Sequence, residues 1–104
     1  MQDPDDATIE QAVRDLPGWT RRGGHLVRTF VHDDFHSAVQ FVERVATAAD
    51  AMACQPEVGI HGGAVTLTLG GGGGAAPSAD DLALARRIQR LGGEHRHPVG
   101  LAGP

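Results

Sequence analysis

The chain has 104 residues and a formal net charge of −4, and all nine of its basic residues are arginine. This length suits one domain. Apolar residues at 40% and charged residues at 21% are enough for a folded core and exclude a disordered chain. The acidic balance and the lack of a basic stripe argue against a nucleic-acid-binding surface.

The N-terminus and the single cysteine bear on the compartment. Residues 1–6 hold neither a basic nor an apolar region, and apolar runs are only a few residues long. The sequence therefore predicts neither a secretion signal nor a membrane span. Cys54 is the only cysteine, which excludes an internal disulfide and fits a reducing compartment. We expect a cytoplasmic protein without membrane or nucleic-acid partners.

The first predicted element is a short amphipathic helix that ends near Asp15. Asp3 or Asp5 can accept hydrogen bonds from the free backbone N–H groups at its start. Its apolar stripe, spaced by three and four residues, consists of Ile9, Val13 and Leu16. Residues 16–19, Leu-Pro-Gly-Trp, should stop the helix, and we expect Trp19 in the core.

A β-hairpin and a long helix should follow. Two glycines separate the expected strands, residues 19–22 and 25–31, and the second strand alternates in polarity. Asp33 or Asp34 can cap a helix over residues 35–52, which we expect to end because of Pro56. The apolar positions of this helix form an arc wide enough to cover a sheet face. They are Phe35, Ala38, Val39, Phe41, Val42, Val45, Ala46 and Ala49.

Two more strands are expected, at residues 57–61 and 65–69, joined by Gly62-Gly63. The second alternates valine and leucine with threonine, as a half-buried strand does. The five glycines of residues 70–74 have no side chains to order them, so they predict a mobile loop.

The last helix should begin at a capping box formed by Ser78 and Asp81. Its inner stripe is predicted as Leu84, Ala85, Ile88 and Leu91. Gly92-Gly93 is typical of a C-cap, so we expect the helix and the domain to end at residue 93. Residues 94–104 are then a flexible tail.

The predicted order α-β-β-α-β-β-α indicates an α+β two-layer sandwich. Strands grouped in hairpins favour a four-stranded antiparallel sheet with the three helices on one face. The other face of the sheet must then be solvated or used for self-association.

In the order of these elements and in several short strings, the chain resembles the pterin-4a-carbinolamine dehydratase family, also called 4a-hydroxytetrahydrobiopterin dehydratase. The likeness runs from Ile9 to Leu91. Matching strings in the N-terminal half are residues 16–19, residues 26–30, Phe35, Ala38 and residues 41–42. In the C-terminal half they are Pro56, residues 65–67, residues 81–82 and residues 84–88. The resemblance implies the α+β fold above, no cofactor, and a homodimer or homotetramer.

The family signature is only partly present. The family has a His-His-Pro corner after the long helix, an aromatic residue some six positions on, a Thr-His pair after the fourth strand, and an Asp opening the last helix. Here the corner reads Cys54-Gln55-Pro56, the aromatic position falls on Gly62, and the pair falls on Gly71-Gly72. Only Pro56 and Asp81 are kept. The resemblance therefore implies a degenerate site that has lost the catalytic histidines.

The remaining polar residues at the matched positions are the candidates for catalysis. Cys54 can be a nucleophile or a redox thiol, and its plainer interpretation is a small buried filler. Asp81 can act as a base, and the alternative is its place in the capping box. Gln55 completes the catalytic candidates. The candidates for lining the pocket are Pro56, Glu57, Gly62 and Gly72.

Other patterns are weaker. The glycine run lacks the Lys-Ser/Thr that follows a phosphate-binding loop. His95 with His97, and His32 with His36, have spacings that can chelate a metal, but no third ligand is evident. His61 is expected to be a surface imidazole. We therefore predict no metal site.

Three functions remain open. The leading hypothesis is a pocket repurposed to bind or transform a different small molecule, either pterin-like or a bulkier biosynthetic intermediate, by a lyase-type dehydration or cyclisation. The second is a non-catalytic oligomerisation or assembly module. The third is residual 4a-hydroxytetrahydrobiopterin dehydratase activity supported by Asp81 and water.

Overall fold

The computed structural model describes residues 4–70 and 76–96, and over these residues the elements follow in the predicted order. The helices are α1 (Asp6–Arg14), α2 (Phe35–Ala51) and α3 (Ala79–Arg96). The strands are β1 (Thr20–Arg22), β2 (His25–Val31), β3 (Glu57–His61) and β4 (Ala64–Gly70). They form one antiparallel sheet in the order β1-β2-β4-β3.

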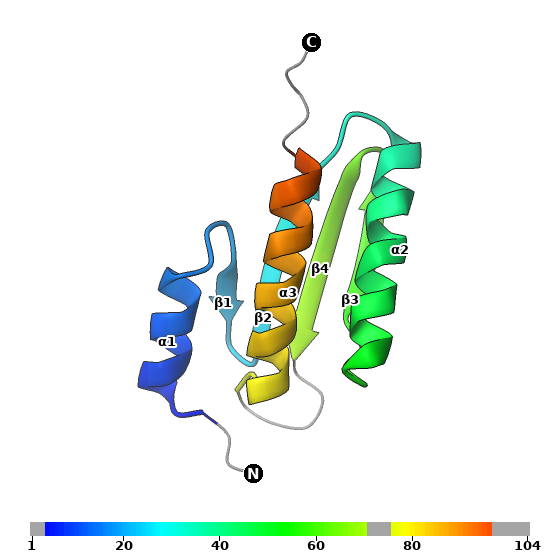
Figure 1. Ribbon diagram of the computed structural model, residues 1–104. Coiled ribbons are helices and arrows are strands. Elements are labelled where there is room, and N and C mark those ends of the chain that lie inside the picture. The colour runs from blue at the N-terminus through cyan, green and yellow to red at the C-terminus, as the bar shows by residue number, and fades with distance from the viewer. Residues whose placement is uncertain (1–3, 71–75, 97–104) are drawn as a thin grey trace.

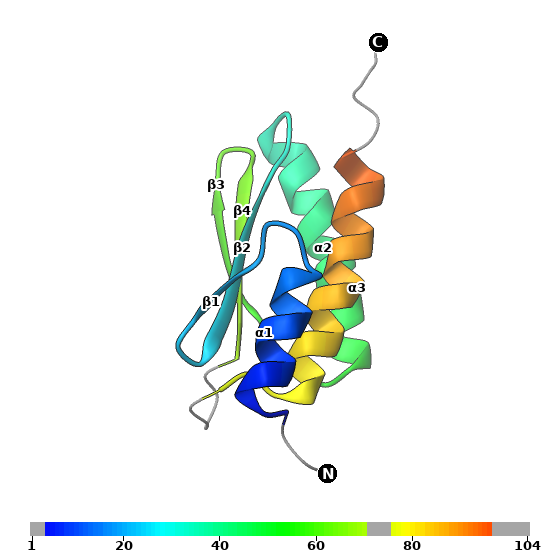
Figure 2. The same cartoon turned by 90° about the vertical axis from the view of Figure 1, so that its left-hand side faces the viewer.

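All three helices cover the same face of the sheet, as Figures 1 and 2 show. The predicted α+β sandwich is therefore confirmed. Most of the glycine run and the end of the predicted tail, residues 71–75 and 97–104, lie outside the described residues. Over the described part of the chain, no helix is both long and apolar enough to cross a bilayer.

Aspartate caps fix where α1 and α2 begin. The Asp5 carboxylate accepts a hydrogen bond from the Thr8 backbone N–H at 2.8 Å, and Asp34 accepts one from Ser37 at the same distance. Hydrogen bonding with Thr8 and Ser37 lowers the pKa of the two carboxyls below the ordinary value of 3.8. Of the cap candidates in the sequence, Asp5 and Asp34 are the ones used.

The core lies between the helices and the covered face of the sheet. The alternation predicted for β4 is confirmed, because its valine and leucines are fully buried while its threonines lie on the other face. The buried apolar residues are Ile9, Ala12, Leu16, Trp19, Leu26, Phe30, Ala38, Phe41, Val45, Ala48, Ala49, Val65, Leu67, Leu69, Leu82, Leu84, Ala85 and Ile88.

A group of interlocking side chains joins Trp19 and β2 to α3, and we call it the tryptophan cluster. Its members are Trp19, Arg28, Phe30, Gln89 and Gly92. The Trp19 indole N–H donates to the Gln89 side-chain oxygen at 3.2 Å, and that oxygen also accepts from the Arg28 guanidinium. Arg28 lies 4.1 Å from the centroid of the Phe30 ring, and Phe30 meets Trp19 edge-on at 6.3 Å.

The Leu-Pro-Gly-Trp turn is fixed by the same cluster. Arg28 donates to the Pro17 carbonyl oxygen at 2.6 Å. Gly18 has φ +86°, and a Cβ there would lie 2.8 Å from the Arg28 guanidinium. Glycine is therefore required at this position both by the backbone conformation and by the close approach of the arginine.

The predicted end of the last helix is wrong. α3 does not stop at Gly92-Gly93 but continues to Arg96, so the first residues of the predicted tail are helical. The reason is a tertiary contact: a Cβ at Gly92 would lie 2.3 Å from the Phe30 ring. Gly92 therefore serves as a close-packing position inside the helix, where the absent side chain leaves room for Phe30.

Candidate functional site

The end of α2 meets the start of α3 at a polar corner, which we define as Cys54, Gln55, Pro56, Ser78 and Asp81. The Cys54 thiol donates to Asp81 Oδ1 across 3.5 Å. Asp81 Oδ2 accepts from the Ser78 backbone N–H at 2.8 Å, and Ser78 Oγ accepts from the Asp81 backbone N–H at 3.1 Å. The predicted capping box is thus present, and the same carboxylate also contacts the cysteine.

A left-handed turn, rather than Pro56, ends α2 and directs Cys54 toward α3. Ala53 has φ +52°, the only positive φ outside glycine among the described residues. The Cys54 backbone N–H then donates to the Ala49 carbonyl at 3.0 Å, which satisfies one of the last free carbonyls of the helix. This conformation is unfavourable for alanine, so local strain is held at the corner.

The environment of Cys54 keeps its thiol protonated at neutral pH. Burial, then the hydrogen bond and charge of Asp81, raise the pKa of Cys54 from 9.0 to about 11. A neutral thiol is a weak nucleophile and a weak metal ligand. The half-buried Cys54 packs against the core and donates to a carboxylate, which fits the filler interpretation better than the nucleophile interpretation.

The other predicted site residues are distributed along β3. Gln55 is exposed and Pro56 is half-buried beside Cys54, and Glu57 opens β3 on the uncovered face of the sheet. A shallow hollow of about 490 Å³ begins at Glu57 and continues over Gly59, Thr66 and Thr68. The structure therefore places an open polar surface next to the corner.

Gly62 lies at the opposite end of this hairpin. It is the turn between β3 and β4, five residues from Glu57, so about 16 Å along an extended strand separates the two. Within one chain the structure does not bring Gly62 to Cys54. Gly72 lies outside the described residues, and the pocket-lining roles of both glycines stay predictions.

The described histidine side chains lie at two ends of the sheet. His61 is exposed beside the β3–β4 turn, as predicted. His32 precedes α2 instead of lying on it, and its half-buried ring lies tilted 4.9 Å from the Phe41 ring, whereas His36 is exposed in the first turn of α2. Among the described residues, no three His, Cys, Asp or Glu side chains gather as a metal site.

Sequence reasoning overlooked His25. This exposed residue pairs in register with Gly70, and a Cβ at Gly70 would lie 3.3 Å from the Asp81 carboxylate. Of the imidazoles in the described region, His25 alone lies at the corner end of the sheet, on its uncovered face. Only the β2–β4 register could have indicated this, and that register is not readable from the spacing of residues.

A second hollow, of about 520 Å³, lies between α1 and β1 and is lined by Val13, Trp19 and Arg21 among others. Arg21 forms ion pairs there with Asp6 at 3.1 Å and Glu10 at 3.2 Å, and the hydrogen bond to Asp6 is the main cause that raises the pKa of Arg21. Because these charges already pair with one another, the hollow offers a ligand few polar groups that are free to bind it.

Comparison with known proteins points to one family. A family model described as pterin 4 alpha carbinolamine dehydratase matches residues 2–91. A Thermomicrobium roseum protein named "Putative pterin-4-alpha-carbinolamine dehydratase" is 39% identical over 87 residues, covering 84% of this chain and 94% of that protein. A Nocardia farcinica protein of the same name is 37% identical over 86 residues, covering 83% and 90%.

The fold also matches a solved structure. The crystal structure of a transcriptional coactivator/pterin dehydratase from Brucella melitensis superimposes with a TM-score of 0.80 at 22% identity. The match covers 88% of this chain and 99% of that one. At this identity the likeness concerns the fold.

Proposed function

This chain belongs to the pterin-4a-carbinolamine dehydratase family, and from that premise we propose that it is a diverged member that binds a small molecule at the corner while accelerating the family reaction little or not at all. The observation that carries this proposal is the contact between Cys54 and Asp81, at a corner where the family has histidines. The corner keeps the proline and the aspartate and offers a protonated thiol and an amide in place of imidazoles.

The chemistry of carbinolamine dehydration explains why this exchange matters. Elimination of water needs one group to protonate the leaving hydroxyl and another to take the proton from nitrogen. Imidazoles titrate near neutral pH and can serve in both roles. The Gln55 amide does neither, and a Cys54 thiol with a pKa of about 11 releases its proton too reluctantly to assist a leaving group at pH 7.

The remaining polar groups favour binding over turnover. Asp81 and Glu57 are carboxylates, and the shallow hollow adds the hydroxyls of Thr66 and Thr68. Carboxylates bind paired N–H donors strongly. We therefore propose that the ligand is a planar heterocycle whose N–H edge faces a carboxylate, either pterin-like or a bulkier intermediate. Replacing imidazoles by smaller groups leaves more room at the corner.

Two measurements test this proposal. Calorimetry monitors the titration of the protein with a tetrahydropterin, and absorbance monitors the decay of a pterin carbinolamine in the presence of the protein. We expect binding, with decay within about twofold of the uncatalysed rate. Asp81→Asn should weaken binding about tenfold, because a charged hydrogen bond is lost. Asp50→Asn, on the exposed side of α2, is the matched control and should bind as the wild type does.

Restoring imidazoles provides the complementary test. The Cys54→His/Gln55→His variant should raise the decay rate above that of the wild type, because it returns titratable groups to the corner. Gln40→His, exposed on α2, adds an imidazole elsewhere and should have no effect. Wild-type turnover well above the uncatalysed rate would overturn the proposed loss and favour residual dehydratase activity.

A specific observation also favours the second candidate, an assembly module that forms homodimers or homotetramers. Four large apolar side chains are exposed on β2, β3 and the start of α2: Val31 at 76%, Phe35 at 59%, Val58 at 42% and Ile60 at 37%. Val58 and Ile60 lie on β3, an edge strand of the sheet, and exposed apolar groups on an edge favour association. Sedimentation of wild type and Val58→Glu/Ile60→Glu would test this, and a monomeric wild type would exclude it.

A further inference from the structure

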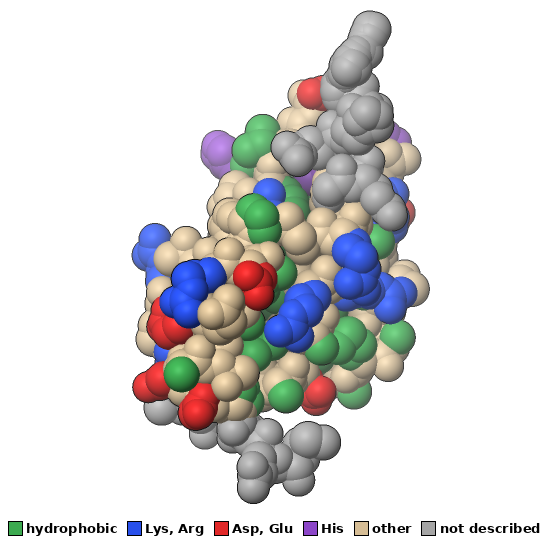
Figure 3. Space-filling model, turned by 60° about the vertical axis from the view of Figure 1, so that its left-hand side comes forward, with side chains coloured by type: hydrophobic (Ala, Val, Ile, Leu, Met, Phe, Trp, Pro, Cys, Tyr) green, Lys and Arg blue, Asp and Glu red, His purple; other side chains and the backbone are tan. Residues whose placement is uncertain are grey.

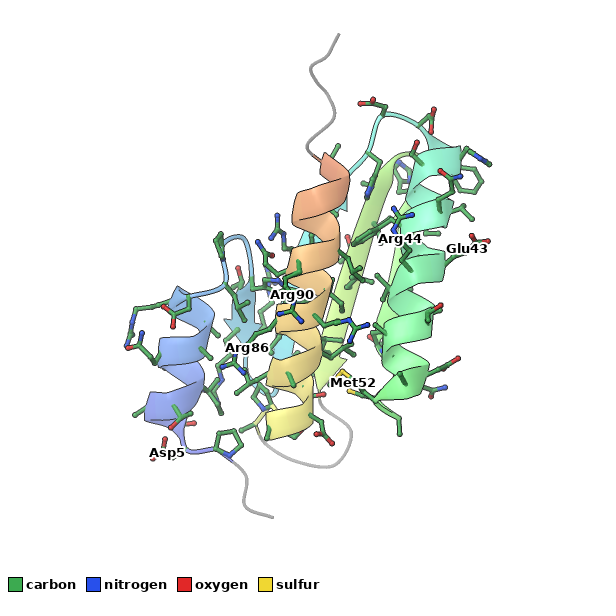
Figure 4. All side chains as sticks on the ribbon, viewed as in Figure 1. Asp5, Glu43, Arg44, Met52, Arg86 and Arg90 are labelled. Carbon is green, nitrogen blue, oxygen red and sulfur yellow. The ribbon has the colours of Figure 1, made fainter. Side chains whose placement is uncertain are left out.

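Arginines occupy one side of the helical layer, beyond the corner along α3. After its first turn, the described exposed residues of α3 are Arg86, Arg87 and Arg90. Arg44 of the neighbouring helix α2 points toward α3, whereas Glu43 points away from it (Figure 4). Basic side chains gather over this side of the molecule in Figure 3. We call Arg44, Arg86, Arg87 and Arg90 the arginine face.

The positive charges of the three arginines on α3 make no evident contribution to the stability of the fold. Within the described part of the chain, Arg86, Arg87 and Arg90 form no ion pair with a carboxylate. Arg86 and Arg90 stand one helical turn apart, where like charges repel. They also lie in the middle of a helix that continues to Arg96, too far from its C-terminus to gain from the helix dipole.

The rest of the surface makes this face stand out. The whole chain carries a net charge of −4, and acidic residues lie around the arginines at the start of α3 and along α2. These neighbours are Glu43, Asp50, Asp80 and Asp81. Asp5 and Asp15, at the two ends of α1, also line a hollow with Arg86. The positive region is therefore small and bounded.

We propose that the arginine face binds an acidic segment of a partner protein. Arginine presents a planar fork of N–H donors that matches a carboxylate in two hydrogen bonds, and basic residues one turn apart match acidic residues one turn apart on a partner helix. From Arg86 to Arg90 the face extends only about 6 Å along the helix axis, enough for two or three carboxylates.

The small extent of the arginine face argues against other anionic partners. A nucleic acid carries a phosphate about every 3.4 Å along each strand, so it would extend beyond this face onto the surrounding acidic residues. A membrane surface would need a broader basic area with apolar side chains that insert. This inference is independent of the proposed small-molecule site, because the two involve different residues of α2 and α3.

The test uses the full chain and a fluorescein-labelled acidic peptide of glutamate, leucine and alanine, about 18 residues long to match α3. Fluorescence anisotropy should show binding that weakens as salt is added. The R86E/R90E variant should lose at least about tenfold in affinity, since two attractions become repulsions. The R14E/R22E variant changes the net charge equally at exposed sites on α1 and β1 and should stay within about twofold.

Circular dichroism would confirm that both variants fold, and a peptide with glutamine in place of glutamate should not bind. Equal losses in R86E/R90E and R14E/R22E would reduce the effect to net charge and overturn the proposal. Absence of wild-type binding to the acidic peptide would overturn it as well. So would R86E/R90E-sensitive binding to a single-stranded RNA or to phosphatidylglycerol vesicles when the peptide does not bind.

Discussion

The tryptophan cluster and the corner lie on the same scaffold and are held in different ways. In the cluster, Trp19, Arg28 and Phe30 contact one another and α3 through stacked rings and shared hydrogen bonds, with no room for a side chain at Gly92. In the corner, a few polar contacts converge on one carboxylate, that of Asp81. The cluster is packed by shape, whereas the corner is connected by directional bonds.

This difference indicates where the sequence can change. A residue in the cluster cannot change volume without displacing several neighbours. A residue at the corner can be exchanged if the cap on α3 survives, because exposed or half-buried polar groups contribute little to the core. The corner can therefore alter its chemistry while the fold of the family is kept.

The largest expected effect is on the cluster side of this comparison. Phe30→Ala should lower the free energy of unfolding by about 3–5 kcal/mol, because it leaves a cavity among Trp19, Arg28 and α3. Cys54→Ala at the corner should cost about 1 kcal/mol or less. Urea unfolding of both variants measures the gap, and similar losses at the two sites would remove the distinction drawn here.

The next largest effect is expected for Gly92→Ala. It should lower the free energy of unfolding, although helix propensity alone predicts an increase. Alanine gains about 1 kcal/mol in a helix interior, but its Cβ would lie 2.3 Å from the Phe30 ring. Overpacking costs about 1–3 kcal/mol, so we expect a net loss of up to about 2 kcal/mol. The control is Gly59→Ala, where a Cβ meets nothing within 4 Å and which should stabilise by about 0.5 kcal/mol.

Gly92 also shows where sequence reasoning succeeds and where it stops. The helix caps and the alternation of β4 depend on neighbours within a few residues, so local rules predicted them. The glycine pair carries a local signal for a helix end, and the Phe30 ring, about sixty residues away, overrides it. Ala53 carries no local signal for a left-handed turn, because that conformation normally calls for glycine.

The candidate site divides in the same way. Cys54 and Asp81 were each selected by resemblance, and the capping box was visible in the sequence, but the contact between them joins residues 27 positions apart. His25 comes to the same end of the sheet only through the β2–β4 register. Contacts that depend on tertiary arrangement could not be derived from residue spacing.

The third prediction concerns the contribution of the capping box to the stability of the corner. Ser78→Ala removes the hydroxyl that accepts from the Asp81 backbone N–H, so the unfolding free energy should fall by about 1 kcal/mol. Ser78→Asp keeps an acceptor at this position and should retain most of the stability. If Ser78→Ala were neutral in thermal unfolding, Asp81 would be held mainly by Cys54 and not by the capping box.

The smallest expected effect at neutral pH comes from the Cys54 thiol, and its contribution to stability depends on pH. Since the pKa of Cys54 is about 11 in the folded chain and 9.0 ordinarily, the unfolded chain loses this proton first. The stability that burial of the neutral thiol provides is therefore complete below pH 9 and is lost as pH rises toward 11. Cys54→Ala should abolish this part of the pH dependence.

The rate of alkylation by iodoacetamide measures the ionisation of the Cys54 thiol directly, because only the thiolate reacts. The rate should rise about tenfold per pH unit and level off near pH 11. In Asp81→Asn the plateau should move to lower pH without reaching 9, since burial, the larger cause, remains. A wild-type plateau well below pH 9 would mean that the corner stabilises the thiolate, and Cys54 would then be available as a nucleophile.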